Sequence, residues 1–175
     1  IPGNQRRATI ADAFAVDPGL PVGEEEIGCA CRRGRSGGRR IDDDQAKLVG
    51  EWTHGEGLKN YVENGYRYTS PAKAGAAEIA SATFEFSVPA DGEYEVRISH
   101  QAHENRSSKT PVTVRSADGE KTIAVNQKIA PPLDKGFYGL GVFRFESGKP
   151  GAVVVTNQGV DGNAHIDAVQ VIKQK

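Results

Sequence analysis

Hydrophobic and polar residues alternate along the chain from residue 41 onward. In the segment Ala82–Val88, the apolar side chains of Phe84, Phe86 and Val88 fall on one face. A two-residue period of this kind is typical of a strand with one buried face. The segment Glu93–Ser99 alternates in the same way and follows a turn-forming sequence, so the two segments are predicted to form a hairpin.

Similar strand patterns continue to the end of the sequence. Pro111–Gln127 contains a second hairpin with an Asp-Gly turn, and the segments Gly139–Glu146, Gly151–Gln158 and His165–Ile172 follow it. No convincing amphipathic helix is present, and glycine is frequent, with 21 residues. Regularly spaced strands with turn residues between them predict an all-β domain over residues 41–175, a jelly-roll-like β-sandwich of about eight or nine strands.

Residues 1–40 have a different composition. They hold seven arginines, no lysine and five acidic residues, which gives +7 − 5 = +2, and Phe14 is their only aromatic residue. Such a segment buries too little apolar surface to fold alone, so a polar arm or linker is predicted, ending in the Arg- and Gly-rich run Arg32–Arg40. A short apolar patch with Ile10, Phe14 and Val16 could add a strand to a neighbouring sheet edge, which would make the chain a self-assembling subunit.

Charge and hydropathy exclude some partners. The 175 residues carry a formal net charge of −1, which gives no general attraction to nucleic acid. No stretch approaches the roughly 20 apolar residues of a membrane-spanning helix. The absence of methionine is expected of a processed or excised chain, and a removed secretory signal would place the protein outside the cell or in the periplasm. Cys29 and Cys31 lack paired C-x-x-C spacing, and both disulfides and free thiols remain open.

Two groups of residues could bind a metal. His100, His103 and Glu104 lie close together, but a zinc-protease motif needs histidines four residues apart on a helix, whereas these follow a strand. A loop is therefore the favoured interpretation, and a metal-dependent or carboxylate-based hydrolase or lyase is a lesser alternative. Asp42 and Asp43 come before the first strands and Asp167 is in the last one. Because first and last strands are often neighbours in sandwiches, these carboxylates could hold Ca²⁺, although a solvated strand start is the favoured interpretation.

Aromatic side chains are candidates for sugar binding, because sugar rings present C–H patches to aromatic faces. Tyr66 and Tyr68 share one face of a predicted strand, and Tyr138 precedes another strand. Trp52 is expected in the core. Asn105 and Arg106 follow the two histidines and could supply hydrogen bonds to a ligand or hold the loop in place.

Residues 42–171 resemble the golvesin C-terminal / xanthan lyase carbohydrate-binding-like domain. The resemblance is carried by the pieces DDDQAKLVGEW, YRY, ATFEFSVPADGEYEVRISHQAHENRSSKTPVTV, TIAVNQ, LGVFRFESG and DGNAHIDAVQV, in that order. It implies a non-catalytic β-sandwich module of the kind attached to secreted lyases and other large exported bacterial proteins. It also implies a polysaccharide or another cell-envelope component as partner, with no established set of ligand-binding residues.

The favoured hypothesis is thus a non-catalytic binding module, with Tyr66, Tyr68 and Tyr138 for stacking and Asn105 and Arg106 for hydrogen bonds. No cofactor other than a possible Ca²⁺ is expected. The alternative is a structural subunit of an extracellular assembly, joined through the N-terminal arm.

Overall fold

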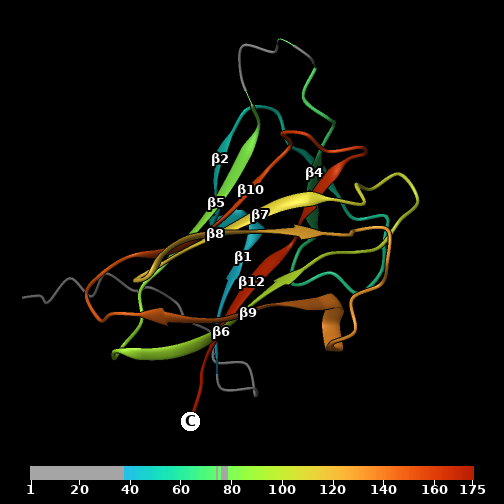
Figure 1. Ribbon diagram of the computed structural model, residues 1–175. Helices are drawn as coiled ribbons and strands as arrows, with labels where there is room; N and C mark the ends of the chain where they lie inside the picture. Colours follow the sequence, from blue (N-terminus) through green and yellow to red (C-terminus); the bar gives the residue numbers. More distant parts are fainter. Residues whose placement is uncertain (1–37, 74, 76–78) are drawn as a thin grey trace, which may run out of the picture. The chain divides into compact units, whose positions relative to one another are not determined.

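The structure is a computed structural model that describes residues 38–73, 75 and 79–175 (Figure 1). Strands dominate it, with two short 3₁₀ turns between them. The elements in chain order are β1 (Gly38–Asp42), η1 (Asp43–Gln45), β2 (Lys47–Val49), β3 (Thr53–Gly55), β4 (Tyr66–Thr69), β5 (Ser81–Phe86), β6 (Gly92–Ser99), β7 (Thr110–Ser116), β8 (Gly119–Val125), η2 (Asp134–Gly136), β9 (Phe137–Phe145), β10 (Gly151–Thr156), β11 (Ala164–Ile166) and β12 (Ala168–Lys173).

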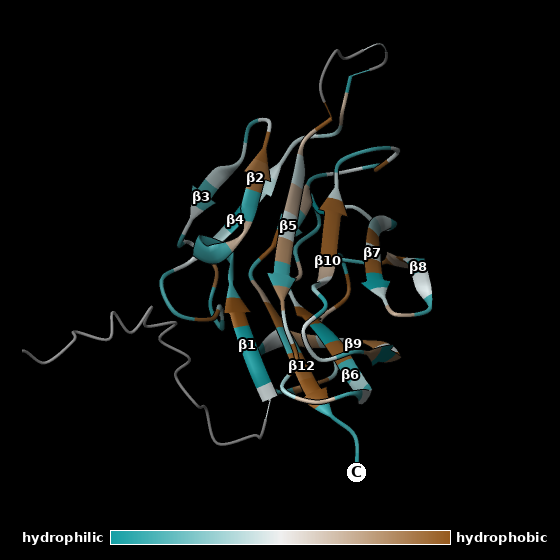
Figure 2. Ribbon diagram, turned by 90° about the vertical axis from the view of Figure 1, so that its left-hand side faces the viewer, coloured by the Kyte–Doolittle hydropathy of each residue, from teal (hydrophilic) through white to brown (hydrophobic). Residues whose placement is uncertain are grey.

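Two antiparallel sheets enclose the core. One has the strand order β1-β12-β6-β9 and the other β2-β5-β10-β7-β8. Both contribute to a single cluster of buried apolar side chains, in which Phe86 and Phe145 from opposite sheets meet edge to face at 5.1 Å between ring centroids. Figure 2 shows the hydrophobic stretches on the strands of both sheets, among them β10 and β12. Full burial of a large apolar side chain stabilises the folded state by about 1.5–3 kcal/mol. The two packed sheets confirm the predicted all-β sandwich.

A third, smaller sheet has the order β11-β4-β3, and a single residue links its strand β11 to β12 of the first sheet. Only Asp167 separates β11 from β12, so the last stretch of chain leaves one sheet and enters another at this carboxylate. Residues 164–171 are buried throughout, which explains why this stretch lacks the clean alternation of β5 and β6. The change of sheet thus places an ionisable side chain in the interior.

The structure differs from the sequence-based expectations in three respects. The hairpin predicted from β5 and β6 is wrong: β5 pairs with β2 and β10, whereas β6 pairs with β9 and β12. Their apolar faces meet across the core instead of lying in one sheet. The described residues hold twelve strands where eight or nine were predicted, because the three-residue strands carry too little pattern to detect. The predicted arm boundary at residue 40 falls inside β1, since Gly38, Arg39 and Arg40 pair with β12.

The sandwich has two different ends. Residues 87–91, 117–118 and 146–150 form the turn end, where the Ala117 N–H donates to the Arg144 carbonyl at 2.9 Å. Residues 56–65, 100–109, 126–136 and 157–163 form the loop end, where the Ser107 N–H donates to the Asn163 carbonyl at 3.0 Å. The paired strands β6 and β9 run from one end to the other, since Gly92 pairs with Phe145 at the turn end and Ser99 with Phe137 at the loop end. Long loops gather at one end only, and candidate sites are found there.

Candidate functional site

Three carboxylates meet where the first and last strands pair. Asp42 ends β1 opposite Ala168, Asp43 opens η1, and Asp167 lies between β11 and β12. One oxygen from each lies within 4.8 Å of the others, and this is the only such group of three among the described residues. The expectation that strand pairing brings Asp42, Asp43 and Asp167 together therefore agrees with the structure. We call them the aspartate triad.

Asp167 is fully buried and held by three donors. The hydroxyl of Ser99 and the amide Nε2 of Gln101 each donate to its Oδ2 at 2.7 Å, and the Val62 N–H donates to Oδ1 at 3.0 Å. Burial raises the pKa of Asp167 to about 6, while the hydrogen bonds from Ser99 and Gln101 oppose the rise. The carboxylate therefore holds two other segments of the chain, one with Ser99 and Gln101 and one with Val62.

Asp42 and Asp43 complete the triad with less support. Burial, followed by the charges of Asp43 and Asp167, raises the pKa of Asp42 to about 7. Its Oδ1 is buried and has no hydrogen-bond partner among the described residues. Asp43 is buried beside Arg67, whose Nε lies 2.9 Å from its Oδ2. A cation at this point would offset the repulsion and meet the oxygen ligands that Ca²⁺ prefers, so the residues fit such an ion. Calcium binding stays a prediction.

A second buried group surrounds Arg106. The side chain is 3% exposed, and its guanidinium carbon lies 5.0 Å from the ring centroid of Tyr68 and 5.6 Å from that of Tyr66. Tyr66, 5% exposed, also stacks on the buried ring of His165 at 4.7 Å. Direct contact of Tyr66 and Arg106 with a sugar does not fit this burial. Arg106 instead secures the loop end, where its backbone bridges to Asn163.

The other predicted ligand-binding residues are half-buried or exposed. Tyr68 is half-buried on β4, and Tyr138 is half-buried on β9, where it packs against the core. Asn105 is exposed, and its Oδ1 lies 2.8 Å from Nδ1 of His103. A binding role for Tyr68, Tyr138 or Asn105 stays a prediction.

The two histidines of the loop after β6 point to different surroundings. His100 is buried, and its Nε2 lies 3.2 Å from the Ile129 carbonyl oxygen. Burial lowers the pKa of His100 to about 4. His103 is half-exposed, and Glu104 is exposed without an ion pair in the described part of the chain. The favoured interpretation of this segment as a strand end and loop agrees with its observed conformation.

A cleft at the loop end was not predicted from the sequence. Its volume is about 890 Å³, and its wall combines residues of β1, the loop before β4, the loop after β6 and the segment before β9. The lining residues are Arg40, Leu58, Lys59, Asn60, Tyr61, Val62, Glu63, His100, Gln101, Ala102, Ala130, Pro131, Leu133, Asp134, Lys135 and Gly136. These residues share no motif, because they come from four distant segments. The only sequence signal is the polar pair His100–Gln101 directly after the alternating strand β6.

Three lining residues carry buried polar atoms without a hydrogen-bond partner among the described residues. They are Nε of Arg40, Nδ1 of His100 and Oε1 of Gln101. Buried polar atoms in folded proteins are nearly always paired, and leaving one unpaired costs about 1–3 kcal/mol. Each of these three atoms is itself inaccessible to solvent, and similar atoms occur away from the cleft, among them Nε of Arg106 and both ring nitrogens of His165.

Several predicted residues lie outside the described part of the chain. They are Cys29, Cys31, Ile10, Phe14 and Val16. Within residues 38–73, 75 and 79–175, no helix is long and apolar enough to cross a membrane.

Comparison with known proteins gives consistent matches. Over 95 residues the chain is 32% identical to the xanthan lyase of Bacillus sp. (strain GL1), which takes in 53% of the chain and 10% of that protein. The structure of Paenibacillus xanthan lyase matches with a TM-score of 0.69 and 27% identity over 78% of this chain and 13% of that one. The GH26-CBM35 β-(1,4)-mannanase of Podospora anserina has a TM-score of 0.53 at 17% identity, over 81% of this chain and 28% of that one, and shares the fold.

The chain thus spans about a tenth of the length of the curated relative that it matches. Residues 40–173 match the family described as the Golvesin C-terminal domain. That range includes all of residues 42–171, on which the sequence resemblance rests. The chain therefore belongs to the Golvesin C-terminal domain family.

Proposed function

We propose that this chain is a non-catalytic, exported carbohydrate-binding module and that it holds a polysaccharide segment in the cleft at the loop end. The observation that carries the proposal is a cleft of about 890 Å³ whose wall combines an aromatic ring, apolar side chains and polar groups. Sugars present both C–H patches and hydroxyl groups, so a wall of this kind offers them apolar contact and hydrogen bonds. The match to two xanthan lyases supports a glycan as the ligand class.

The wall of the cleft has the mixed character that a sugar ring requires. Tyr61 is half-buried and supplies an aromatic ring, and Leu58, Pro131 and Leu133 add apolar surface for C–H groups. Polar side chains lie between them. Binding sites of this type combine apolar contact with a few oriented polar groups, which give specificity.

The absence of catalysis and the exported location are also part of the proposal. The matched region is a small fraction of each xanthan lyase, which supports an accessory role beside a larger catalytic part. The rival hypothesis is a carboxylate-based hydrolase or lyase acting through Glu63 and Asp134, which line the same cleft. Release of new reducing or unsaturated ends from a bound polysaccharide, abolished in Glu63→Gln or Asp134→Asn, would establish that rival.

The binding proposal is tested by calorimetry and affinity electrophoresis with soluble galactomannan, dextran, xanthan and polygalacturonate. We expect at least one of them to bind, and Tyr61→Ala to weaken that binding about tenfold, or ~1.4 kcal/mol. Lys121→Ala is the matched control, because Lys121 is exposed on β8 and outside the cleft. If Tyr61→Ala binds normally while Tyr138→Ala loses binding, the glycan lies on β9 and the cleft assignment is wrong.

Self-assembly is the second candidate function. The nine-residue strand β9 forms an edge of its sheet, and Val142 on it is 52% exposed, so this edge could accept an added strand. The strand would come from residues 1–37 of a second copy. Native mass spectrometry of the chain with and without these residues tests the idea, since a deletion variant that still forms the same oligomer would rule out the arm.

A further inference from the structure

Three residues of the cleft lining have an unusual backbone conformation. Asn60, Glu63 and Lys135 have φ angles of 69°, 57° and 55°, in the left-handed region. They are the only non-glycine residues of the described chain in this region, and all three line the cleft. Asparagine tolerates this conformation, whereas glutamate and lysine adopt it only where surrounding contacts impose it. Such residues cluster at ligand-binding sites, so the contacts that hold them bear on what the cleft does.

The Ser99 hydroxyl connects one of these residues to the buried carboxylate of Asp167. Its Oγ lies 2.7 Å from Asp167 Oδ2 and 3.1 Å from the Lys135 carbonyl oxygen, so its one proton is shared between two acceptors. The next residue, Gly136, lies against the same strand end. A Cβ on Gly136 would meet the His100 carbonyl oxygen at 3.0 Å and Ser99 Oγ at 3.5 Å. The segment before β9, which forms one wall of the cleft, is thus held closely against the end of β6.

Gln101 connects another wall of the cleft to the same carboxylate. Its Nε2 donates to Asp167 Oδ2 at 2.7 Å and to the Asn60 carbonyl oxygen at 3.2 Å. The Val62 N–H donates to Asp167 Oδ1 at 3.0 Å. Asn60 and Glu63, the two left-handed residues of the loop before β4, lie on either side of Val62 in the sequence. Asp167 therefore holds, directly or through one side chain, the backbone of both segments that contain left-handed residues.

We propose that Ser99, Gln101 and Asp167, which we call the Asp167 network, are positioning residues for the cleft. They hold two of its wall segments, the loop before β4 and the segment before β9, in the strained conformation that a ligand meets on binding. A wall that is already in place loses less conformational entropy on binding than one that must first be ordered, so the network raises the affinity without touching the ligand. This inference rests on the proposed function, namely that the cleft holds a glycan.

The first test compares two buried serines. Ser99 and Ser107 are both fully buried, and each hydroxyl donates to a carboxylate oxygen, at 2.7 Å to Asp167 and at 2.8 Å to Asp161. Ser107 does not line the cleft. We expect Ser99→Ala and Ser107→Ala to lower the Tm by similar amounts. Only Ser99→Ala should weaken, by about tenfold, binding of whichever of galactomannan, dextran, xanthan and polygalacturonate the wild type holds. Affinity electrophoresis is run in EDTA, because Asp167 is also a candidate calcium ligand.

The second test needs no ligand. Lys135→Gly and Lys135→Ala both remove the charged side chain, but only glycine also removes the cost of the left-handed conformation. If the Asp167 network imposes that conformation, the Tm of Lys135→Gly should lie about 2 °C above that of Lys135→Ala. The advantage of glycine should disappear in the Ser99→Ala background, where residue 135 can relax. This double-mutant cycle isolates the coupling between the two positions.

The outcomes separate this inference from the proposed function. Normal binding by Ser99→Ala, or an equal loss of binding in Ser107→Ala, overturns the positioning role and leaves the glycan site standing. A glycine advantage of the same size in both backgrounds also overturns it, because the local turn alone would then set the conformation of residue 135. If the wild type binds none of the four polysaccharides, the proposed function fails and the gain in affinity fails with it, whereas the cycle at residue 135 still decides whether the network holds the wall.

Discussion

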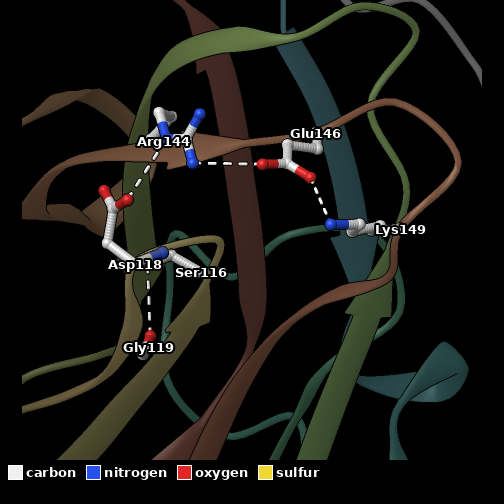
Figure 3. A network of polar contacts seen from close by, with 6 residues as sticks. All are labelled: Ser116, Asp118, Gly119, Arg144, Glu146 and Lys149. Carbon is white, nitrogen blue, oxygen red and sulfur yellow. Dashed lines mark hydrogen bonds and ion pairs between the residues drawn. The ribbon is translucent and has the colours of Figure 1, made fainter.

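The exposed ion network of the turn end and the buried ionisable groups of the loop end differ in the direction of their pKa shifts. At the turn end, Arg144 lies between Asp118 and Glu146, with distances of 3.2 and 3.0 Å, and Lys149 pairs with Glu146 (Figure 3). Hydrogen bonding from Lys149 lowers the pKa of Glu146, which keeps it charged. At the loop end, burial raises the pKa values of Asp42 and Asp167 and lowers that of His100, so each shifts toward its neutral form.

The difference shows where polar residues cost free energy. Exposed ion pairs contribute little, because water and salt screen them and their side chains lose conformational entropy. Buried ionisable groups are costly unless neighbours pair with them. The exposed ion pairs of the turn end are therefore expected to contribute little to stability, whereas the buried polar groups of the loop end depend on specific partners.

The largest expected effect comes from removing the buried carboxylate of Asp167. In Asp167→Ala, the Ser99 hydroxyl, the Gln101 amide and the Val62 N–H all lose their acceptor. Each unpaired donor costs about 1–3 kcal/mol, so the free energy of unfolding should fall by about 3 kcal/mol or more. Urea denaturation measures this change. The matched variant at the turn end, Asp118→Ala, should be indistinguishable from the wild type, and equal losses in both would refute the contrast between the ends.

Calcium provides the next largest effect. If the aspartate triad binds Ca²⁺, a concentration of about 100 times the Kd should stabilise the fold by about 2.7 kcal/mol. Thermal denaturation with Ca²⁺ and with EDTA measures the shift in Tm. Asp42→Asn should remove the shift, and Asp118→Asn should retain it. A wild-type Tm that is the same with Ca²⁺ and with EDTA would show that the triad is a purely structural feature.

Much of the fold could be predicted from the sequence, because one face of most strands is buried. Phe84, Phe86, Val96 and Ile98 are buried as their alternation indicates. Which strands pair could not be predicted in the same way: β5 and β6 lie next to each other in sequence, yet they meet across the core. Local alternation specifies a buried face but not the sheet to which a strand belongs.

The site was only partly predictable, for a related reason. The meeting of Asp42 with Asp167 follows from pairing of the first and last strands, which general knowledge of sandwiches suggested. The cleft depends on loops whose conformations are set by tertiary contacts, and no local pattern marks Tyr61 or Arg40. Arg106 was expected either to bind a ligand or to hold the loop in place, and the sequence could not decide between them, because its burial against two tyrosines is a tertiary contact.

A smaller effect is expected from pH, which should change the contribution of Asp42 at the loop end to the stability of the calcium-free protein. Because the pKa of Asp42 is raised to about 7 in the folded state from an ordinary value of 3.8, the folded state binds a proton between these pH values and the unfolded state does not. The contribution of Asp42 to stability therefore becomes more favourable as the pH falls from about 7 toward 4. Asp42→Asn should raise the Tm in EDTA at pH 8, and this gain should vanish near pH 4. A gain that is constant across this range would show that the carboxyl titrates normally.

The smallest effect is expected at the turn end itself. Arg144→Gln removes the ion pairs with Asp118 and Glu146, but Glu146 keeps Lys149 as a partner. The backbone link between the sheets also remains, because the Ala117 N–H donates to the carbonyl of residue 144 and not to its side chain. We therefore expect the Tm to change by no more than about 1 °C, at both low and high salt. A large loss at low salt that disappears at high salt would mean that the network acts cooperatively and stabilises the turn end, and the contrast between the two ends would then lie in their exposure and not in their contribution to stability.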